Sequence, residues 1–232
     1  GDVYKRQALN QVDINLEVIV VDDGSIDGTE EFFKTYQNPA VRYFRKENEG
    51  LPALTRNFGA GEAQGEYLAF LDSDDTWFQE KLKIQIDTMR NNPDLLFCYG
   101  QAVARIEEKE IKVSGPFFKK SGNIFYPLMF RNFIVTSSVL IKREVFEKMS
   151  GFPIDQDLPI AEDLKLWLKV SMIGHGKYIE SPIVHYDLGS GGISEDVSKR
   201  FDCLYKVLDW GMKENKTSKI LRSIISVSYT HL

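Results

Sequence analysis

Cysteine is scarce in this chain, and its placement argues against several classes of protein. The 232 residues include two cysteines, Cys98 and Cys203, which lie far apart. They show neither the close spacing of a zinc site nor the several pairs of a disulfide scaffold, and Cys98 lies in an apolar run that predicts a core position. Long apolar runs are missing too, since a membrane-spanning helix needs about 18 or more apolar residues in succession. We therefore expect a globular, cytoplasmic protein.

The chain also has no excess of positive charge. Lysine and arginine number 29 against 34 acidic residues, which gives a formal net charge of -5. Nucleic-acid binders usually carry a basic patch, so nucleic acid is not an expected partner. No internal repeat is visible, and the length predicts a single domain over residues 8–226. Residues 1–7 and 227–232 lack a periodic pattern, and we expect both to be tails that do not belong to the fold.

Three acidic residues lie within four positions of the chain: Asp72, Asp74 and Asp75. They follow the apolar, aromatic-rich run 67–71, which predicts a buried strand that ends at these acids. Carboxylates this close raise one another's pKa unless a positive group neutralises them. Mg²⁺ or Mn²⁺ would do so, because such cations bind one or two carboxylates together with phosphate oxygens. The alternative is a solvated acidic turn, with Asp75 capping the next helix.

A second acidic pair, Asp22 and Asp23, follows the β-branched run 16–21, which predicts another strand. Strands and helices alternate up to residue 71, a pattern typical of βαβ units with a parallel sheet. Right-handed crossovers would bring both acidic strand ends to one edge of that sheet, where open α/β sheets bind ligands. Arg56, on the predicted helix 53–63, is either a surface residue or a partner for phosphate. The pattern favours an α/β protein that binds a metal and a nucleoside diphosphate.

Glu162 and Asp163 begin a predicted helix over residues 161–170. Acids in a first helical turn are favoured by the helix dipole, and this alone explains both residues. The functional alternative is a general base, because a fixed carboxylate in a pocket can remove a proton from an attacking hydroxyl. His185, in a short apolar strand, is either a structural residue or a further metal ligand or base.

Three stretches taken in order carry a resemblance to one family: 20–29, 71–75 and 162–167. The ordered set resembles the inverting family-two glycosyltransferases of the GT-A fold, and the resemblance covers about residues 8 to 194. It implies a mostly parallel, Rossmann-like sheet flanked by helices. Asp23, with Asp22, would contact the nucleobase and Arg56 the nucleotide. Asp72, Asp74 and Asp75 would meet the ribose and, through Mn²⁺ or Mg²⁺, the diphosphate; Asp74 and Asp75 would lie nearest the metal. Asp163, beside Glu162, would be the catalytic base.

The resemblance also implies that different segments of the chain have different functions. Residues 8–106 would bind the nucleotide sugar, residues 107–194 would bind the acceptor and supply catalysis, and residues 195–226 would form C-terminal helices. The family's opening strand and its turn have no counterpart here, so we expect the chain to be truncated at its N-terminus and its activity to be weakened. The Gln-x-x-Arg-Trp signature of processive members is missing as well, which favours addition of single sugars.

The expected donor is a nucleoside diphosphate sugar, most simply a UDP-sugar, and the expected acceptor is a surface glycan or a lipid-linked sugar. Such an acceptor would bring the protein into peripheral contact with the inner face of the membrane. Two other hypotheses stay open at this point: a nucleotidyltransferase, which would release pyrophosphate, and a non-catalytic module that binds glycan or nucleotide.

Overall fold

A computed structural model describes residues 8–106, 109–113, 120–155, 160–186 and 197–215. The tails expected at 1–7 and 227–232 lie outside these residues. So do residues 187–194, where the Gly/Ser-rich sequence predicts a loop, and residues 217–225, where the sequence predicts a helix. Among the described helices, none is both long enough and apolar enough to cross a membrane.

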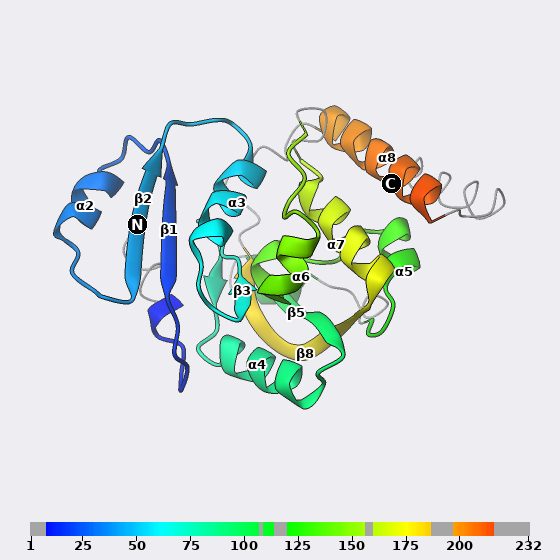
Figure 1. Ribbon diagram of the computed structural model, residues 1–232, viewed down its shortest axis with the longest axis horizontal. Helices are drawn as coiled ribbons and strands as arrows, with labels where there is room; N and C mark the ends of the chain where they lie inside the picture. Colours follow the sequence, from blue (N-terminus) through cyan, green and yellow to red (C-terminus); the bar gives the residue numbers. More distant parts are fainter. Residues whose placement is uncertain (1–7, 107–108, 114–119, 156–159, 187–196, 216–232) are drawn as a thin grey trace.

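The first part of the chain forms a two-stranded parallel sheet with a helix beside each strand (Figure 1). Its elements are β1 (Val18–Asp23), α2 (Thr29–Thr35), β2 (Val41–Lys46) and α3 (Pro52–Glu62). Pro52 is suited to the first turn of α3, because the amide it lacks has no partner there. α3 packs closely on β1: a Cβ atom on Gly59 would lie 3.1 Å from Val21 Cγ2. The predicted succession of strand and helix is confirmed here.

A larger sheet follows, with its main strands in the order β3-β7-β5-β8-β4 and with β6 paired to β5. Its strands are β3 (Tyr67–Ala69), β4 (Thr76–Trp77), β5 (Leu95–Ile106), β6 (Lys109–Lys112), β7 (Leu140–Lys142) and β8 (His175–Tyr186). β5 and β8 pair in parallel over most of their length. The other pairs in this sheet, β3–β7, β4–β8, β5–β6 and β5–β7, are antiparallel.

The predicted α/β class is therefore confirmed, but the expectation of a mostly parallel sheet needs correction for the described strands. The βαβ pattern stops at β3, and the later strands are joined by irregular connections and a hairpin, which permit antiparallel pairing. β3 moreover pairs with β7 and not with β1 or β2. The run 136–141 by itself predicts one continuous strand, and this prediction is wrong in its first half, because Thr136–Ser138 form a 3₁₀ turn before β7.

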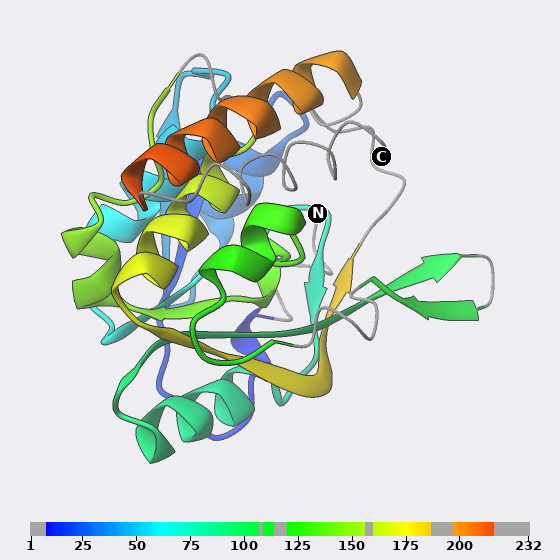
Figure 2. The ribbon, with the colours of Figure 1, turned by 90° about the vertical axis from the view of Figure 1, so that its right-hand side faces the viewer.

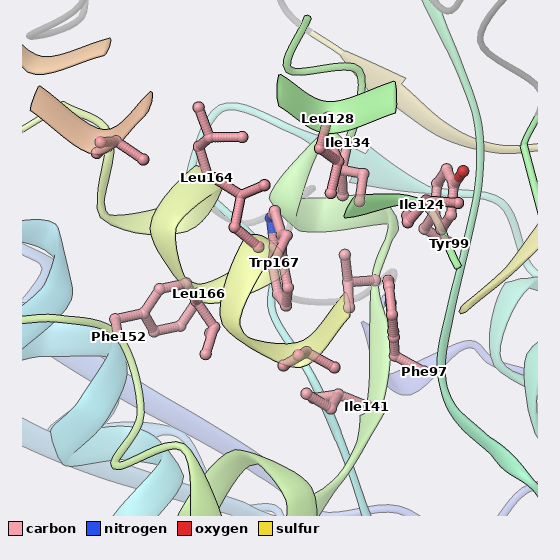
Figure 3. Packing of buried hydrophobic residues seen from close by; sticks show 14 of the residues in the cluster. Phe97, Tyr99, Ile124, Leu128, Ile134, Ile141, Phe152, Leu164, Leu166 and Trp167 are labelled. Carbon is pink, nitrogen blue, oxygen red and sulfur yellow. The ribbon is translucent and has the colours of Figure 1, made fainter. Parts of the chain in front are cut away.

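Helices cover both faces of the larger sheet (Figure 2). α4 (Lys81–Asn91) packs on one face, whereas α5 (Phe125–Phe130), α7 (Glu162–Ile173) and α8 (Val197–Glu214) lie on the other, and α6 (Arg143–Lys148) follows β7. The core between α7 and the sheet is aromatic: the Trp167 ring stacks on Phe97 and meets the edge of Phe152 (Figure 3). Cys98 is fully buried, as predicted.

α7 is buried on nearly all sides, which the sequence pattern did not indicate. The spacing predicts an amphipathic helix with one face formed by Leu164, Trp167, Leu168 and Ser171. That face is buried, but so are Leu166 and Val170. A helix that is buried over most of its circumference is a core helix, and α7 is enclosed by the sheet, α5 and α8. Only a narrow strip of the helix is exposed. The packing around it also holds its first turn in place.

A charged residue is enclosed at the start of α4. Lys81 has no exposed surface, its Nζ donates to Gln85 Oε1 at 2.7 Å, and it lies 4.1 Å from the centre of the Trp77 ring. Gln85 Nε2 in turn donates to the Ser138 carbonyl oxygen at 2.9 Å, so this chain of contacts supports the 3₁₀ turn. Burial lowers the pKa of Lys81 to about 7.

We expect the buried ammonium to make stability depend on pH. Between pH 7 and 9 the unfolded chain keeps the Lys81 proton that the folded chain releases, so the free energy of unfolding rises with pH. The wild type should gain about 2 kcal/mol over this interval relative to Lys81→Met, at about 1.4 kcal/mol per pH unit for one proton. Urea denaturation of both proteins at the two pH values measures this. Lys83→Met, at an exposed position of the same helix, is the control and should follow the wild type; parallel profiles for wild type and Lys81→Met would contradict the assignment.

Candidate active site

Arg56 connects two of the acidic motifs that are far apart in the sequence. From α3 its Nη2 donates to Asp72 Oδ1 at 2.7 Å, and its Nη1 donates to Glu162 Oε1 at 2.7 Å. Burial opposes the charge of the guanidinium, but Asp72 and Glu162 outweigh this and raise the pKa of Arg56 above its usual value. The bridge places the end of β3 and the start of α7 side by side.

The loop after α6 packs against Arg56 through the ring of Phe152. The Arg56 guanidinium carbon lies 5.4 Å from the centre of the buried Phe152 ring. Asn57, the next residue of α3, accepts a hydrogen bond from the Phe152 amide at 2.8 Å and donates one to its carbonyl at 2.7 Å. Gly151 has a φ of +68°, and a Cβ atom there would lie 2.4 Å from Asn57 Oδ1. Glycine is therefore required for this close approach.

The 3₁₀ turn Thr136–Ser138 touches both acidic motifs. The Asp72 amide donates to Ser137 Oγ at 3.1 Å, and Thr136 Oγ1 donates to Asp163 Oδ2 at 3.3 Å. Trp77 Nε1 fixes the turn by donating to the Ser137 carbonyl at 2.8 Å. Short polar side chains in a buried turn thus set the position of the acids relative to each other.

Glu162 and Asp163 begin α7, as predicted, but burial changes their ionisation. Glu162 is 6% exposed, and burial together with the Asp163 charge raises its pKa to about 7 against the opposing effect of Arg56. Its Oε2 is buried and accepts no hydrogen bond from the described part of the chain. Burial also raises the pKa of the half-buried Asp163, although Arg56 and hydrogen bonds from Leu164 and Asn132 oppose this. A carboxylate with a raised pKa in a cluster of acids is suited to proton transfer.

The other acids after β3 differ in exposure. Asp75 is 1% exposed, and its amide donates to the Asp72 carbonyl at 3.2 Å, whereas Asp74 is half-buried. Within the described ranges no three or more histidine, cysteine, aspartate or glutamate residues are grouped to hold a metal ion. Mg²⁺ and Mn²⁺ sites on nucleotides commonly use one or two carboxylates and take phosphate oxygens as further ligands. A half-exposed Asp74 beside Asp72 fits that kind of site, in a cluster where carboxylates outnumber the single guanidinium.

Asp22 and Asp23 stand at the end of β1, in the smaller sheet. Asp22 is 4% exposed and accepts hydrogen bonds from the Ser25 amide at 2.8 Å and the Tyr43 hydroxyl at 2.5 Å. Burial opposes its ionisation, but these hydrogen bonds outweigh it and hold the pKa of Asp22 below its usual value. Asp23 differs, because its Oδ1 is buried and accepts no hydrogen bond from the described residues.

His185 has an aromatic packing partner, and it lies opposite the residue that follows Asp75. It lies opposite Thr76 in the β4–β8 pair, and its ring stacks on Phe78 with 4.1 Å between ring centres. This contact agrees with the structural reading of His185. Four residues near the site were not predicted: Asn132, Thr136, Ser137 and Phe152. The polar run 136–138, just before an apolar strand, is a signal from which Thr136 and Ser137 could have been found.

The comparisons with known proteins agree with this architecture. Residues 6–150 match the family model described as "Glycosyl transferase family 2". An "Uncharacterized glycosyltransferase" of Rickettsia bellii is 36% identical over 171 residues, covering 72% of this chain. The chain spans about a quarter of that relative's length, 24%.

Two further proteins are similar over more of the chain. The "UDP-Glc:alpha-D-GlcNAc-diphosphoundecaprenol beta-1,3-glucosyltransferase WfaP" of Escherichia coli is 27% identical over 218 residues, covering 94% of this chain and 76% of its own. The structure of the mannosyltransferase PcManGT of Pyrobaculum calidifontis, solved with GDP-Man and Mn²⁺, superimposes with a TM-score of 0.68 at 20% identity. The match covers 98% of this chain and 65% of that one, and it confirms the GT-A fold.

Proposed function

Since this chain belongs to glycosyl transferase family 2, we propose that its acidic site transfers one sugar from a nucleoside diphosphate sugar to a hydroxyl group of an acceptor. The observation that carries the proposal is the bridge from Asp72 through Arg56 to Glu162, with Asp163 beside it. It joins the acids after β3 to the acids that begin α7, so a ligand held by one motif would lie close to the other.

The donor would lie along the ends of β1 and β3. Asp23 is the better candidate for the nucleobase than Asp22, because its Oδ1 accepts no hydrogen bond from the described residues. Asp22 already has partners and would fix the loop that follows β1. Asp72 would meet the ribose, with Arg56 close enough to turn toward the diphosphate. The UDP-glucose named for the E. coli relative supports a uridine donor.

Asp74, with Asp75 behind it, would hold Mn²⁺ or Mg²⁺ against the donor's diphosphate. The Mn²⁺ solved with the P. calidifontis structure supports a divalent cation in this fold. Bound there, the cation would supply Lewis-acid stabilisation of the departing diphosphate. Asp75, at 1% exposure, would act mainly by fixing the loop and adding negative charge.

Asp163 would act as the base in a single displacement. Its carboxylate would take the proton of the acceptor hydroxyl while that oxygen bonds to the anomeric carbon. The bond from this carbon to the diphosphate oxygen breaks at the same time on the opposite side, which inverts the configuration. Thr136 and Asn132 hold Asp163 Oδ2 through long hydrogen bonds of 3.3 and 3.4 Å, and Glu162 holds Arg56 in place. Glu162 is thus assigned a positioning role.

The acceptor we propose is a sugar joined to a lipid through a diphosphate, in the synthesis of a surface polysaccharide. The acceptor named for the E. coli relative has this chemistry, and that relative covers most of the chain. The test is product analysis with a panel of UDP- and GDP-sugars and a sugar diphospholipid acceptor. Release of the nucleoside diphosphate with a glycosidic product of inverted configuration is expected; release of pyrophosphate would instead indicate a nucleotidyltransferase.

We expect Asp74→Asn to remove the metal dependence of donor binding. Titration calorimetry with UDP should show an affinity gain of about tenfold or more on adding Mn²⁺ to the wild type, equivalent to about 1.4 kcal/mol. The variant should keep the metal-free affinity and lose the gain, because the amide no longer supplies an anionic ligand. Asp94→Asn, at an exposed position, is the control. An unchanged Mn²⁺ effect in Asp74→Asn would assign the cation to other residues.

A further inference from the structure

The 3₁₀ turn Thr136–Ser138 contacts both groups of acids in the site. Ser137 Oγ accepts a hydrogen bond from the Asp72 amide at 3.1 Å, and Thr136 Oγ1 donates one to Asp163 Oδ2 at 3.3 Å. All three residues of the turn are at most 5% exposed, so close packing leaves the turn little room to move. The position of the turn therefore helps to set the distance between the acid assigned to the ribose and the acid assigned as the base.

Two side chains hold this turn through its backbone carbonyl groups. Trp77 Nε1 donates to the Ser137 carbonyl oxygen at 2.8 Å, and Gln85 Nε2 donates to the Ser138 carbonyl oxygen at 2.9 Å. Gln85 comes from α4, which packs on the face of the larger sheet opposite to α7 (Figure 2). The contacts therefore connect a helix on one face of the sheet to the acids that begin a helix on the other face.

Lys81 determines which way the Gln85 amide group faces. Its Nζ donates to Gln85 Oε1 at 2.7 Å, one turn along α4, and both side chains are fully buried. An ammonium group has only donors, so the Gln85 oxygen faces Lys81. The Gln85 NH₂ group is then directed toward the carbonyl oxygens of Ser138 and, at 3.5 Å, Cys98. An apolar side chain could fill the space of Lys81 without the cost of a buried charge, but it would not fix this orientation.

We propose that Lys81 and Gln85 are positioning residues of the active site, which act through the turn Thr136–Ser138 to hold Asp163 in place relative to the donor. The inference rests on the proposed function and adds two fully buried residues to the site. Lys81 fixes the Gln85 amide, the amide holds the last carbonyl group of the turn, and the first hydroxyl group of the turn contacts the base. Because a misplacement of about 1 Å can cost about 10²-fold in rate, loss of these contacts should lower kcat.

The kinetic test is a double-mutant cycle. Lys81→Met with Gln85→Met replaces both polar partners by apolar groups, so neither is left buried and unpaired. This pair of changes should lower kcat for sugar transfer by about tenfold or more. Thr136→Val removes the hydroxyl that contacts Asp163, and combined with the pair it should add little further loss, because both changes interrupt the same series of contacts. A pair that keeps the wild-type kcat, or losses that multiply as for independent sites, would overturn the inference.

Amide hydrogen exchange tests the same contacts without sugar transfer. The Ser138 and Val139 amides donate to backbone carbonyls at 2.8 and 3.0 Å, so their exchange reports on the turn. With Lys81→Met and Gln85→Met together, both amides should exchange about tenfold or more faster, while the amides that pair β5 with β8 stay as protected as in the wild type. Lys83→Met, at an exposed position of α4, is the control and should leave exchange and kcat unchanged.

The exchange measurement also separates this inference from the proposed function. Faster exchange confined to the turn would support the link from Lys81 to the turn even if the wild type transfers none of the sugars tried, a result that would contradict the proposed function alone. Unchanged exchange at the turn would overturn the inference and leave the proposed function standing. An equal increase in β5 and β8 would do the same, because it would show that the two residues contribute only general stability.

Discussion

Asp163→Asn is expected to reduce kcat for sugar transfer by a factor of about 10² to 10⁴, the range that general-base catalysis contributes. The amide has nearly the same shape and can still accept the 2.6 Å hydrogen bond from the Leu164 amide, but it cannot take the proton of an attacking hydroxyl. Donor binding should change little, because the donor contacts are assigned to other residues. Initial rates at saturating donor and acceptor, with calorimetry on UDP, measure both effects.

The dependence of the wild-type reaction on pH gives an independent check on the same residue. A base works only when deprotonated, and burial raises the pKa of Asp163. The rise of kcat/KM with pH should therefore lie above the range of an ordinary carboxylate, and activity should be lost earlier as the pH falls. Asp87→Asn, at an exposed position of α4, should leave rate and profile unchanged. A variant Asp163→Asn that keeps more than a tenth of kcat would assign the base elsewhere.

The succession of elements could be predicted from the sequence up to β3 because each element there has its own local signal. The β-branched run before Asp22 and Pro52 at the start of α3 are examples. Strand pairing beyond β3 could not be predicted, because it depends on contacts between distant residues. The pairing of Leu68 with Ile141 illustrates this, since nothing in either short apolar run specifies its partner or its direction.

The acidic motifs of the site could be located from the sequence, but not the contacts that join them. Arg56 was a candidate partner for phosphate. Its bridge to Asp72 and Glu162 could not be predicted, because Arg56 and Glu162 are 106 positions apart in the chain. Thr136 and Ser137 contact the acids because they lie in a buried turn. The sequence contains many other hydroxyl groups, and nothing in it distinguishes these two. The sequence thus supplies the chemical groups, and packing supplies their arrangement.

Arg56→Met should destabilise the protein and abolish most of its activity. The change leaves the 8% exposed Glu162 side chain and Asp72 without their shared cation. Removing one partner of a buried ion pair typically costs about 3–5 kcal/mol. The free energy of unfolding should fall by about this amount at pH 8 in urea denaturation. Arg42→Met, which breaks a half-exposed pair with Glu62, should cost no more than about 1 kcal/mol.

The sign of the pH effect distinguishes a lost charge partner from lost packing. Without Arg56, the pKa of Glu162 should rise above its wild-type value of about 7, so the folded variant binds a proton that the unfolded chain releases above its own lower pKa. The variant should therefore regain stability as the pH falls from 8 toward 6, more steeply than the wild type. Glu162→Gln in the Arg56→Met background should restore stability at pH 8, because it removes the unpaired charge while keeping the side chain's volume. If the double variant is as unstable as the single one at both pH values, the Phe152 contact and not the ion pair is what Arg56 contributes.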